Sequence, residues 1–258
     1  MKDLTVIIPV HKYDETIKTM LDKALESFNK ANSSNEASLL IVAPTKITKE
    51  LSDAYKDTPI QYVETKKSDF SSQINAAVKA VTTKYFSILE FDDEYTENWF
   101  KNVETYINAS YDVSVYLPLT EIVMADHPER GSVGYVNEAV WASSFSDEIG
   151  YLDLDCLQEY MNFNTTGGVF KTEDFLAIGG LKASMKLSFW YEYMLRSVYN
   201  GKKIFVIPKV GYKHLLVRED SLSNEYNKNM SEKEADWWID LAKKEYYFKT
   251  DRKKTYEE

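Results

Sequence analysis

Four carboxylates stand close together near the middle of the chain. They are Glu90, Asp92, Asp93 and Glu94, and they directly follow an apolar segment at residues 85–89. Alternate side chains of an extended chain point the same way, so Glu90 and Asp92 are expected to share one side. Like charges this close repel, unless one takes up a proton or the group shares a cation. Carboxylate oxygens suit Mg²⁺ or Mn²⁺, which commonly bridge them to phosphate groups.

The same residues have a second interpretation as the acidic start of a helix. Asp93 or Glu94 would then cap a segment that holds Trp99 and Phe100. The position of the cluster after a strand favours the metal site, because ligands of open α/β sheets bind beyond the carboxyl ends of the strands.

The elements before the cluster alternate between strand and helix. Residues 4–10 (Leu-Thr-Val-Ile-Ile-Pro-Val) form a run typical of a strand buried on both faces, and residues 16–28 carry apolar side chains at helical spacing. Further strands are predicted at residues 39–42, 60–64 and 85–91, with helices at residues 49–56 and 72–81. This order predicts right-handed βαβ units and an α/β fold.

The pattern changes after about residue 125, where turns and mixed aromatic and acidic residues follow. Short helices are predicted at residues 173–178 and 188–199, and a strand at residues 203–208. Residues 231–258 read as a helical C-terminal tail with nearly balanced charge. This tail could lie on a membrane surface through Trp237 and Trp238, but its nearly balanced charge favours packing back on the domain or against a partner helix.

The composition is that of a folded protein. The 258 residues include 44% hydrophobic residues, which excludes disorder as the main state, and a net charge of −10 argues against broad nucleic-acid binding. The single cysteine, Cys156, cannot form an internal disulfide. No segment approaches the ~20 apolar residues that span a bilayer, and the first residues lack the layout of a signal peptide. We therefore expect no transmembrane segment and a cytoplasmic location.

Several segments together resemble the motifs of family-two glycosyltransferases, which use nucleotide-sugar donors. The first strand and loop of that family are similar to residues 6–11 (Val-Ile-Ile-Pro-Val-His), and its Asp-x-Asp strand to residues 85–93. The remaining similar segments are residues 72–77, the glycine segments 167–171 and 178–181, the helix 189–196, and His214 shortly before residues 221–223. The resemblance spans roughly residues 4–223.

This resemblance implies a GT-A (Rossmann-like) α/β fold, with a mixed, mostly parallel sheet flanked by helices. It implies that residues 1–124 form a nucleotide-sugar-binding half and residues 125–230 an acceptor-binding half of the same domain, followed by the tail at residues 231–258. The implied reaction is inverting transfer of a sugar from a nucleoside-diphosphate sugar to an acceptor hydroxyl, assisted by Mn²⁺ or Mg²⁺. The acceptor class stays open between a glycan, a lipid-linked sugar, a protein and a modified base.

Site residues follow from the same resemblance. The implied metal ligands are Glu90, Asp92 and His214. The implied nucleotide-sugar-binding residues are Pro9, Val10, His11, Asp69, Asn75 and Asp92. The implied acceptor-binding residues are Gly167, Gly168 and Trp190, and the implied catalytic base is Glu192, whose pKa we expect burial to raise. Each has a plainer interpretation: Glu192 can pair with Arg196 one helical turn away, and Asn75 can bridge local backbone.

Three features depart from the family pattern. The family usually has an acidic Glu-Asp pair where this chain has Phe189 and Trp190. The base is therefore Glu192 or lies elsewhere, for example at Asp153 or Asp155. The second strand ends in residues 43–45 (Ala-Pro-Thr) rather than in acidic residues that hold the nucleotide, and Glu90 replaces the usual aspartate.

Two other functions compete with the transferase. The missing acidic pair keeps open, as an alternative that ranks below the transferase, a sugar- or nucleotide-binding module that has lost turnover. A nucleotidyltransferase ranks lower, because its class typically has a glycine-rich basic loop after the first strand, whereas residues 9–12 (Pro-Val-His-Lys) contain no glycine.

Overall fold

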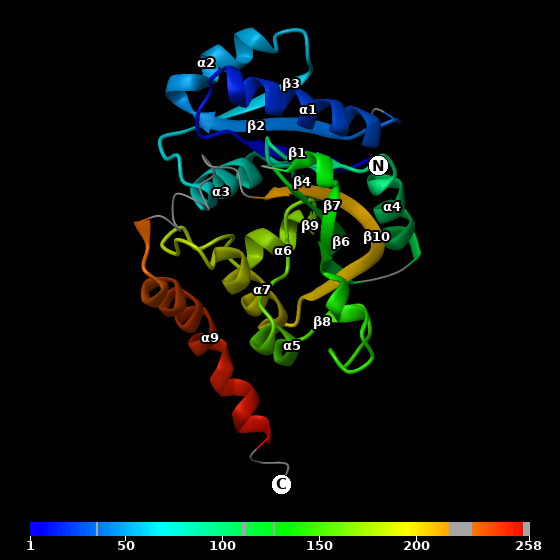
Figure 1. Cartoon of the computed structure of the whole chain (residues 1–258), viewed down its shortest axis with the longest axis vertical. Helices are drawn as coiled ribbons and strands as arrows, with labels where there is room; N and C mark the ends of the chain where they lie inside the picture. Colours follow the sequence, from blue (N-terminus) through cyan, green and yellow to red (C-terminus); the bar gives the residue numbers. More distant parts are fainter. Residues whose placement is uncertain (35, 110–111, 126, 217–228, 255–258) are drawn as a thin grey trace.

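The computed structural model describes residues 1–34, 36–109, 112–125, 127–216 and 229–254. Its centre is a sheet with the strand order β3-β2-β1-β4-β9-β6-β10-β5, with β7 paired to β6 and β8 paired to β10. Helices cover both faces of this sheet (Figure 1). The predicted mixed α/β fold with a C-terminal helix is confirmed.

The first part of the sheet is parallel and follows the predicted strand–helix alternation. Its strands are β1 (Leu4–Pro9), β2 (Ser38–Pro44), β3 (Ile60–Thr65) and β4 (Tyr85–Ile88), and its helices are α1 (Glu15–Ala31), α2 (Thr45–Ala54) and α3 (Phe70–Ala80). Every residue of β1 is buried, because α1 and α2 cover one face of the sheet and α3 the other. Ile7 points to the α3 side, and its neighbours Val6 and Ile8 point to the α1 side.

The second part of the sheet is mixed. Its strands are β5 (Glu94–Tyr95), β6 (Val113–Met124), β7 (Ser132–Val136), β8 (Tyr151–Leu152), β9 (Val169–Lys171) and β10 (Lys203–Leu216). Its helices are α4 (Trp99–Ala109), α5 (Leu154–Glu159), α6 (Thr172–Ala177), α7 (Phe189–Tyr199) and α9 (Glu232–Lys254), with short 3₁₀ turns at Pro128–Arg130 and Glu138–Trp141. Strand β9 joins the two parts, because it pairs antiparallel with both β4 and β6.

Two elements differ from the sequence-based expectations. The long strand β6 lies inside the sheet although no strand was predicted at its residues, and β10 extends to Leu216 rather than ending near residue 208. The residues 221–223 of the resemblance lie outside the described residues. Helix α9 packs against α7 and α5, as favoured for the tail, and no helix among the described residues is both long and apolar enough to cross a membrane.

Candidate functional site

A cavity of about 340 Å³ opens near the carboxyl end of β4, between α3 and α7. Asp69, at the start of α3, and Glu90, just after β4, form part of its wall. The segments 163–166 and 183–190 close other sides, and His214 reaches it from β10. The location agrees with the rule that ligands of α/β sheets bind at the carboxyl ends of the strands.

Glu90, Asp93 and His214 come together at the edge of this cavity. Each offers one possible ligand atom, and these atoms lie within 4.8 Å of one another. Asp93 is 1% exposed, and its two carboxylate oxygens are bonded to His214 Nδ1 at 2.8 Å and to the backbone N–H of Leu215 at 2.9 Å. Asp93 therefore fixes the imidazole ring, while Glu90 and His214 both line the cavity.

The acidic surroundings keep His214 protonated. Burial by itself would lower the pKa of His214, but the carboxylate of Asp93, with Glu90 and Asp92 nearby, raises this pKa to about 9. At neutral pH the imidazolium therefore offsets part of the negative charge of the cluster.

The grouped residues differ from the predicted ligands in one position: Asp93, and not Asp92, lies with Glu90 and His214 among the described residues. The expectation for Asp92 rested on an extended chain, but β4 ends at Ile88 and the backbone N–H of Asp93 turns back to the carbonyl of Glu90 at 3.1 Å. Two carboxylates and an imidazole form a donor set that fits Mg²⁺ or Mn²⁺, provided that the imidazole first loses its proton.

Aromatic side chains form the opposite wall. Phe70 stacks on Phe189 with ring centroids 5.5 Å apart and meets the edge of Trp190 at 6.2 Å. Trp190 in turn stacks on Phe170 at 5.5 Å. The predicted acceptor residue Trp190 thus reaches the cavity, and with Phe189 it presents flat apolar surface suited to the face of a sugar or base.

The residues predicted to hold the donor fall into two groups. Asp69 lines the cavity, and its Oδ1 caps α3 by accepting from the N–H of Ser72 at 2.8 Å. Pro9 and Val10 are buried and do not line it; the carbonyl of Val10 instead accepts from Gln73 Nε2 at 3.0 Å. The ring of His11 lies 5.5 Å from that of Phe91.

Asn75, Gly167 and Gly168 also make internal contacts and do not line the cavity. The side chain of Asn75 brackets the backbone of Leu181, accepting from its N–H at 2.9 Å and donating to its carbonyl at 2.7 Å. Gly167 has a φ of +75°, and a Cβ there would lie 2.4 Å from the ring of Tyr212. A Cβ at Gly168 would lie 2.8 Å from the carbonyl of Thr165. The glycines are therefore explained by close packing.

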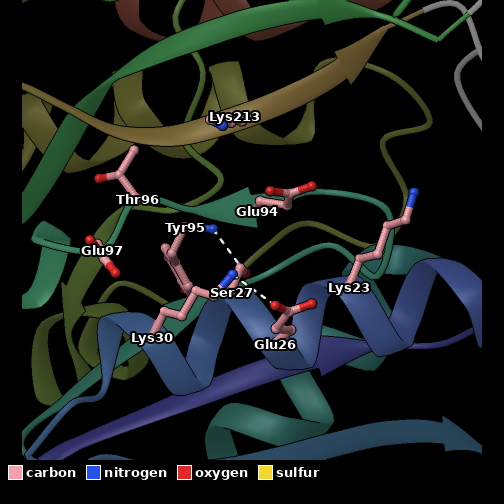
Figure 2. Close-up of a pocket in the computed structure, with 9 residues that line it drawn as sticks. All are labelled: Lys23, Glu26, Ser27, Lys30, Glu94, Tyr95, Thr96, Glu97 and Lys213. Carbon is pink, nitrogen blue, oxygen red and sulfur yellow. Dashed lines mark hydrogen bonds and ion pairs between the residues drawn. The ribbon is translucent and has the colours of Figure 1, made fainter.

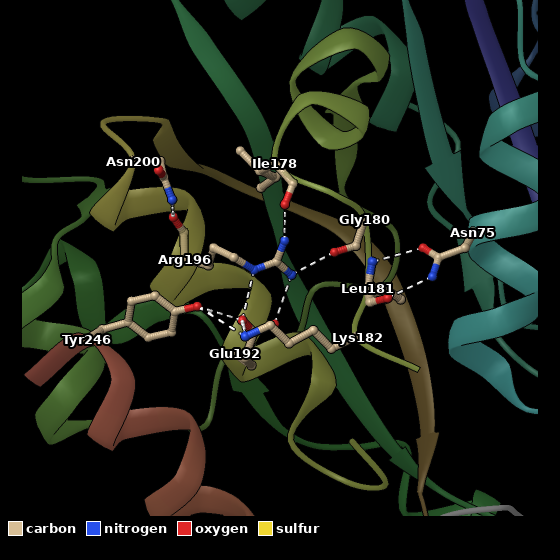
Figure 3. Close-up of polar contacts among 9 residues, drawn as sticks. All are labelled: Asn75, Ile178, Gly180, Leu181, Lys182, Glu192, Arg196, Asn200 and Tyr246. Atoms are coloured by element: carbon tan, nitrogen blue, oxygen red, sulfur yellow. Dashed lines mark hydrogen bonds and ion pairs between the residues drawn. The ribbon is translucent and has the colours of Figure 1, made fainter. Parts of the chain in front are cut away.

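Glu192 lies in a buried ion cluster (Figure 3) and not on the cavity wall. Arg196 donates from Nε to Oε1 at 2.8 Å and from Nη2 to Oε2 at 2.9 Å, and Lys182 lies 2.9 Å from Oε1. The hydroxyl of Tyr246 also donates to Oε1, at 2.8 Å. Burial acts to raise the pKa of Glu192, but these donors outweigh it and hold this pKa below its ordinary value, so the expected rise is wrong.

A second cavity, of about 570 Å³, lies between α1 and β5 (Figure 2). Positively charged lysine and negatively charged glutamate side chains both line it, and Lys30 forms an ion pair with Glu26 at 2.7 Å. Glu94, the last carboxylate of the acidic cluster, lines this cavity and not the first. Glu90 and Glu94, only four positions apart in the sequence, therefore line two different cavities.

Sequence reasoning missed two segments of the first cavity. Residues 163–166, 183 and 185–187 line it, and they were missed because nothing in their spacing distinguishes them from ordinary loops. The alternative bases Asp153 and Asp155 do not line it, and Asp153 caps α5 by accepting from the N–H of Cys156 at 2.7 Å. The acidic cluster in the sequence contains Asp93. The buried contact of Asp93 with His214 could not be predicted from the sequence, because the two residues are 121 positions apart.

Solved structures of Staphylococcus aureus TarS share this fold. TarS 1-349 is 15% identical with a TM-score of 0.62, over 83% of this chain and 60% of that chain. Its complex with UDP-GlcNAc is 16% identical with a TM-score of 0.64, over 86% of this chain and 61% of that chain. This chain thus spans about three fifths of the length of these two structures. The likeness confirms the GT-A fold.

No curated protein matches this sequence. The family model described as "Glycosyl transferase family 2" matches residues 5–158, which is more than half of the chain. The matched residues contain α3, β4 and the acidic cluster that borders the first cavity. The chain therefore belongs to glycosyl transferase family 2.

Proposed function

We propose that this chain transfers a sugar, with inversion, from a nucleoside-diphosphate sugar to an acceptor hydroxyl. The observation that carries the proposal is the cluster of Glu90, Asp93 and His214 at the edge of a cavity whose other wall is aromatic. Such a cavity offers ligands for a cation that could bind a diphosphate, and a flat apolar surface to a sugar ring. Family membership and the UDP-GlcNAc complex of TarS support this donor class.

Glu90, Asp93 and His214 would hold a divalent cation, and the contact of Asp93 with His214 Nδ1 would fix the orientation of the imidazole. When bound, Mg²⁺ or Mn²⁺ would stabilise the negative charge that develops on the departing diphosphate. In the metal-free protein the protonated imidazole supplies positive charge at the same place.

The proton of the acceptor hydroxyl needs a base within hydrogen-bond reach. Both oxygens of Glu192 are bonded to Arg196, so its proposed role as the base finds no support in this geometry. Asp69 and Glu90 are the described carboxylates that line the cavity. Because Glu90 is proposed as a ligand of the cation, we assign the base to Asp69.

One specific observation favours a second candidate function, a binding module without turnover. Phe189 and Trp190 occupy the positions of the family's acidic pair and form cavity wall, so those positions supply no carboxylate. Such a module would bind the nucleotide sugar through the same charged edge and aromatic wall.

Calorimetry with Mn²⁺ and a panel of nucleotide sugars that includes UDP-GlcNAc tests the proposal. We expect Mn²⁺-dependent binding, weakened at least about tenfold by Glu90→Gln. Glu94→Gln is the matched control, because Glu94 lies four residues away but lines the other cavity. Equal behaviour of the two variants would contradict the assignment of the site.

A second measurement separates the two candidate functions. Release of the nucleoside diphosphate in the presence of sugar acceptors supports the transferase, and its loss in Asp69→Asn with donor binding retained identifies Asp69 as the base. Donor binding without any release supports the binding module.

A further inference from the structure

Residues 183–190 form one wall of the cavity. Polar contacts at both ends of this segment connect it to the C-terminal helix α9. At one end of this wall, the hydroxyl of Tyr246 donates to Glu192 at 2.8 Å, and Lys182 lies 2.9 Å from the same carboxylate oxygen. Arg196 extends the network, because it holds Glu192 and also donates to the carbonyls of Gly180, at 2.7 Å, and Ile178 (Figure 3). A continuous set of polar contacts thus leads from α9 to the segment that enters the wall.

The other end of the wall has its own bond to α9. Ser188 is the N-cap residue of α7, yet its hydroxyl makes no cap hydrogen bond. It donates instead to the carbonyl of Trp238 at 2.9 Å. Serine at this position ordinarily caps its own helix, so the hydroxyl has exchanged that bond for one to the tail. Ser188 directly precedes Phe189 and Trp190, which line the cavity.

Burial separates the inner and outer faces of α9. Tyr246 is 4% exposed and Ala242 is 1% exposed, whereas Trp237 is 53% and Leu241 is 43% exposed. The network therefore lies on the face that packs against the domain. Because Glu192 is a charged group that is 1% exposed, each lost donor leaves it less well paired, and its surroundings must rearrange.

We propose that α9 positions the acceptor side of the cavity, with Tyr246 as its main positioning residue. Tyr246 acts through Glu192 on Lys182 and Arg196, and Ser188 fixes the start of α7. The structural coupling stands on the contacts alone, and its consequence for the acceptor rests on the proposed function.

Hydrogen exchange measured by mass spectrometry on the full chain tests the coupling. In Tyr246→Phe we expect amide exchange in residues 178–190 to become about fivefold faster, because one buried hydrogen bond is lost. Tyr55→Phe is the matched control: it removes a similar hydroxyl–carboxylate bond, 2.7 Å to Asp22, on the other face of the sheet. Ser188→Ala is a second variant expected to loosen the same segment. Unchanged exchange in residues 178–190 in both Tyr246→Phe and Ser188→Ala would overturn the coupling.

Kinetics test the functional consequence with UDP-GlcNAc as donor and methyl glycosides as acceptors. Tyr246→Phe should raise the KM for the glycoside at least about threefold and leave the KM for the donor within about twofold. An equal rise in both values would overturn a role confined to the acceptor side. If the unaltered chain neither binds nor turns over a nucleotide sugar, the proposed function fails, while the exchange experiment still decides the coupling.

Discussion

The two parts of this sheet hold their functional groups in different ways. In the parallel part, Asp69 and Glu90 reach the cavity because α3 begins and β4 ends beside it, within regular βαβ units. In the mixed part, the wall at residues 183–190 is held by side chains that bond to distant backbone, such as Arg196 to Gly180 and Asn75 to Leu181. Side chains that are positioned by the ends of strands and helices keep their place when other side chains change. A segment that is held by buried charged side chains depends on each of those side chains.

The largest expected difference between the two parts is in the loss of stability when one member of an ion pair is removed. Arg196→Ala leaves Glu192 buried without its main partner and should lower the free energy of unfolding by about 3–5 kcal/mol. Lys18→Ala breaks an exposed pair with Asp22 in the parallel part and should leave stability unchanged. Urea denaturation of both variants measures this. A small effect of Arg196→Ala would show that the mixed part is not held by its buried charges.

The contact between His214 and Asp93 joins the two parts and predicts a pH dependence. The pKa of His214 is raised from 6.5 to about 9 in the folded protein, so its stabilising contribution is present below pH 6.5 and is lost as pH rises through 9. The loss should be on the order of 3 kcal/mol. Urea denaturation in EDTA between pH 6 and pH 9.5 checks it, and the dependence should disappear in His214→Gln. A stability that rises over this range would contradict the assignment.

The smallest expected effect is at the junction between the two parts of the sheet, where Gly167 contacts Ile88 at the end of β4. The N–H of Gly167 donates to the carbonyl of Ile88 at 2.8 Å. Its φ is +75°, and a Cβ there would lie 2.4 Å from the ring of Tyr212. Gly167→Ala should cost about 1–3 kcal/mol of unfolding free energy. Gly134→Ala is the control, because no atom lies within 4 Å of a Cβ placed there. Equal melting temperatures of the two variants would show that Tyr212 and its neighbours can move to accommodate the added methyl group.

The sequence predicted the parallel part well, because its pattern is local. The buried run at residues 4–10 and the helical spacing at residues 16–28 each define an element without reference to the rest of the chain. The mixed part lacked such signals. Strand β6 was missed, although its first six residues are buried, since its neighbours β9 and β10 come much later in the sequence.

Some of the predicted site residues line the cavity, and others are held away from it by tertiary contacts. Glu90, Asp69 and Trp190 reach the cavity as residue type and family resemblance suggested. Asp93 replaces Asp92 in the cluster because the chain turns after β4, and alternation holds only in extended backbone. Glu192 and Asn75 carry the polar groups that the chemistry calls for, but their partners Arg196 and Leu181 occupy them.

The bond between Tyr246 and Glu192 joins residues 54 positions apart. During synthesis, β1 to β4 can pair as soon as residue 88 has emerged from the ribosome, whereas the wall at residues 183–190 gains its last support only when α9 follows. A nascent chain therefore completes the parallel part of its sheet long before either the charged cluster, which needs His214, or the aromatic wall is in place. Both sides of the cavity are thus completed only by segments at the end of the chain, β10 for the charged cluster and α9 for the aromatic wall.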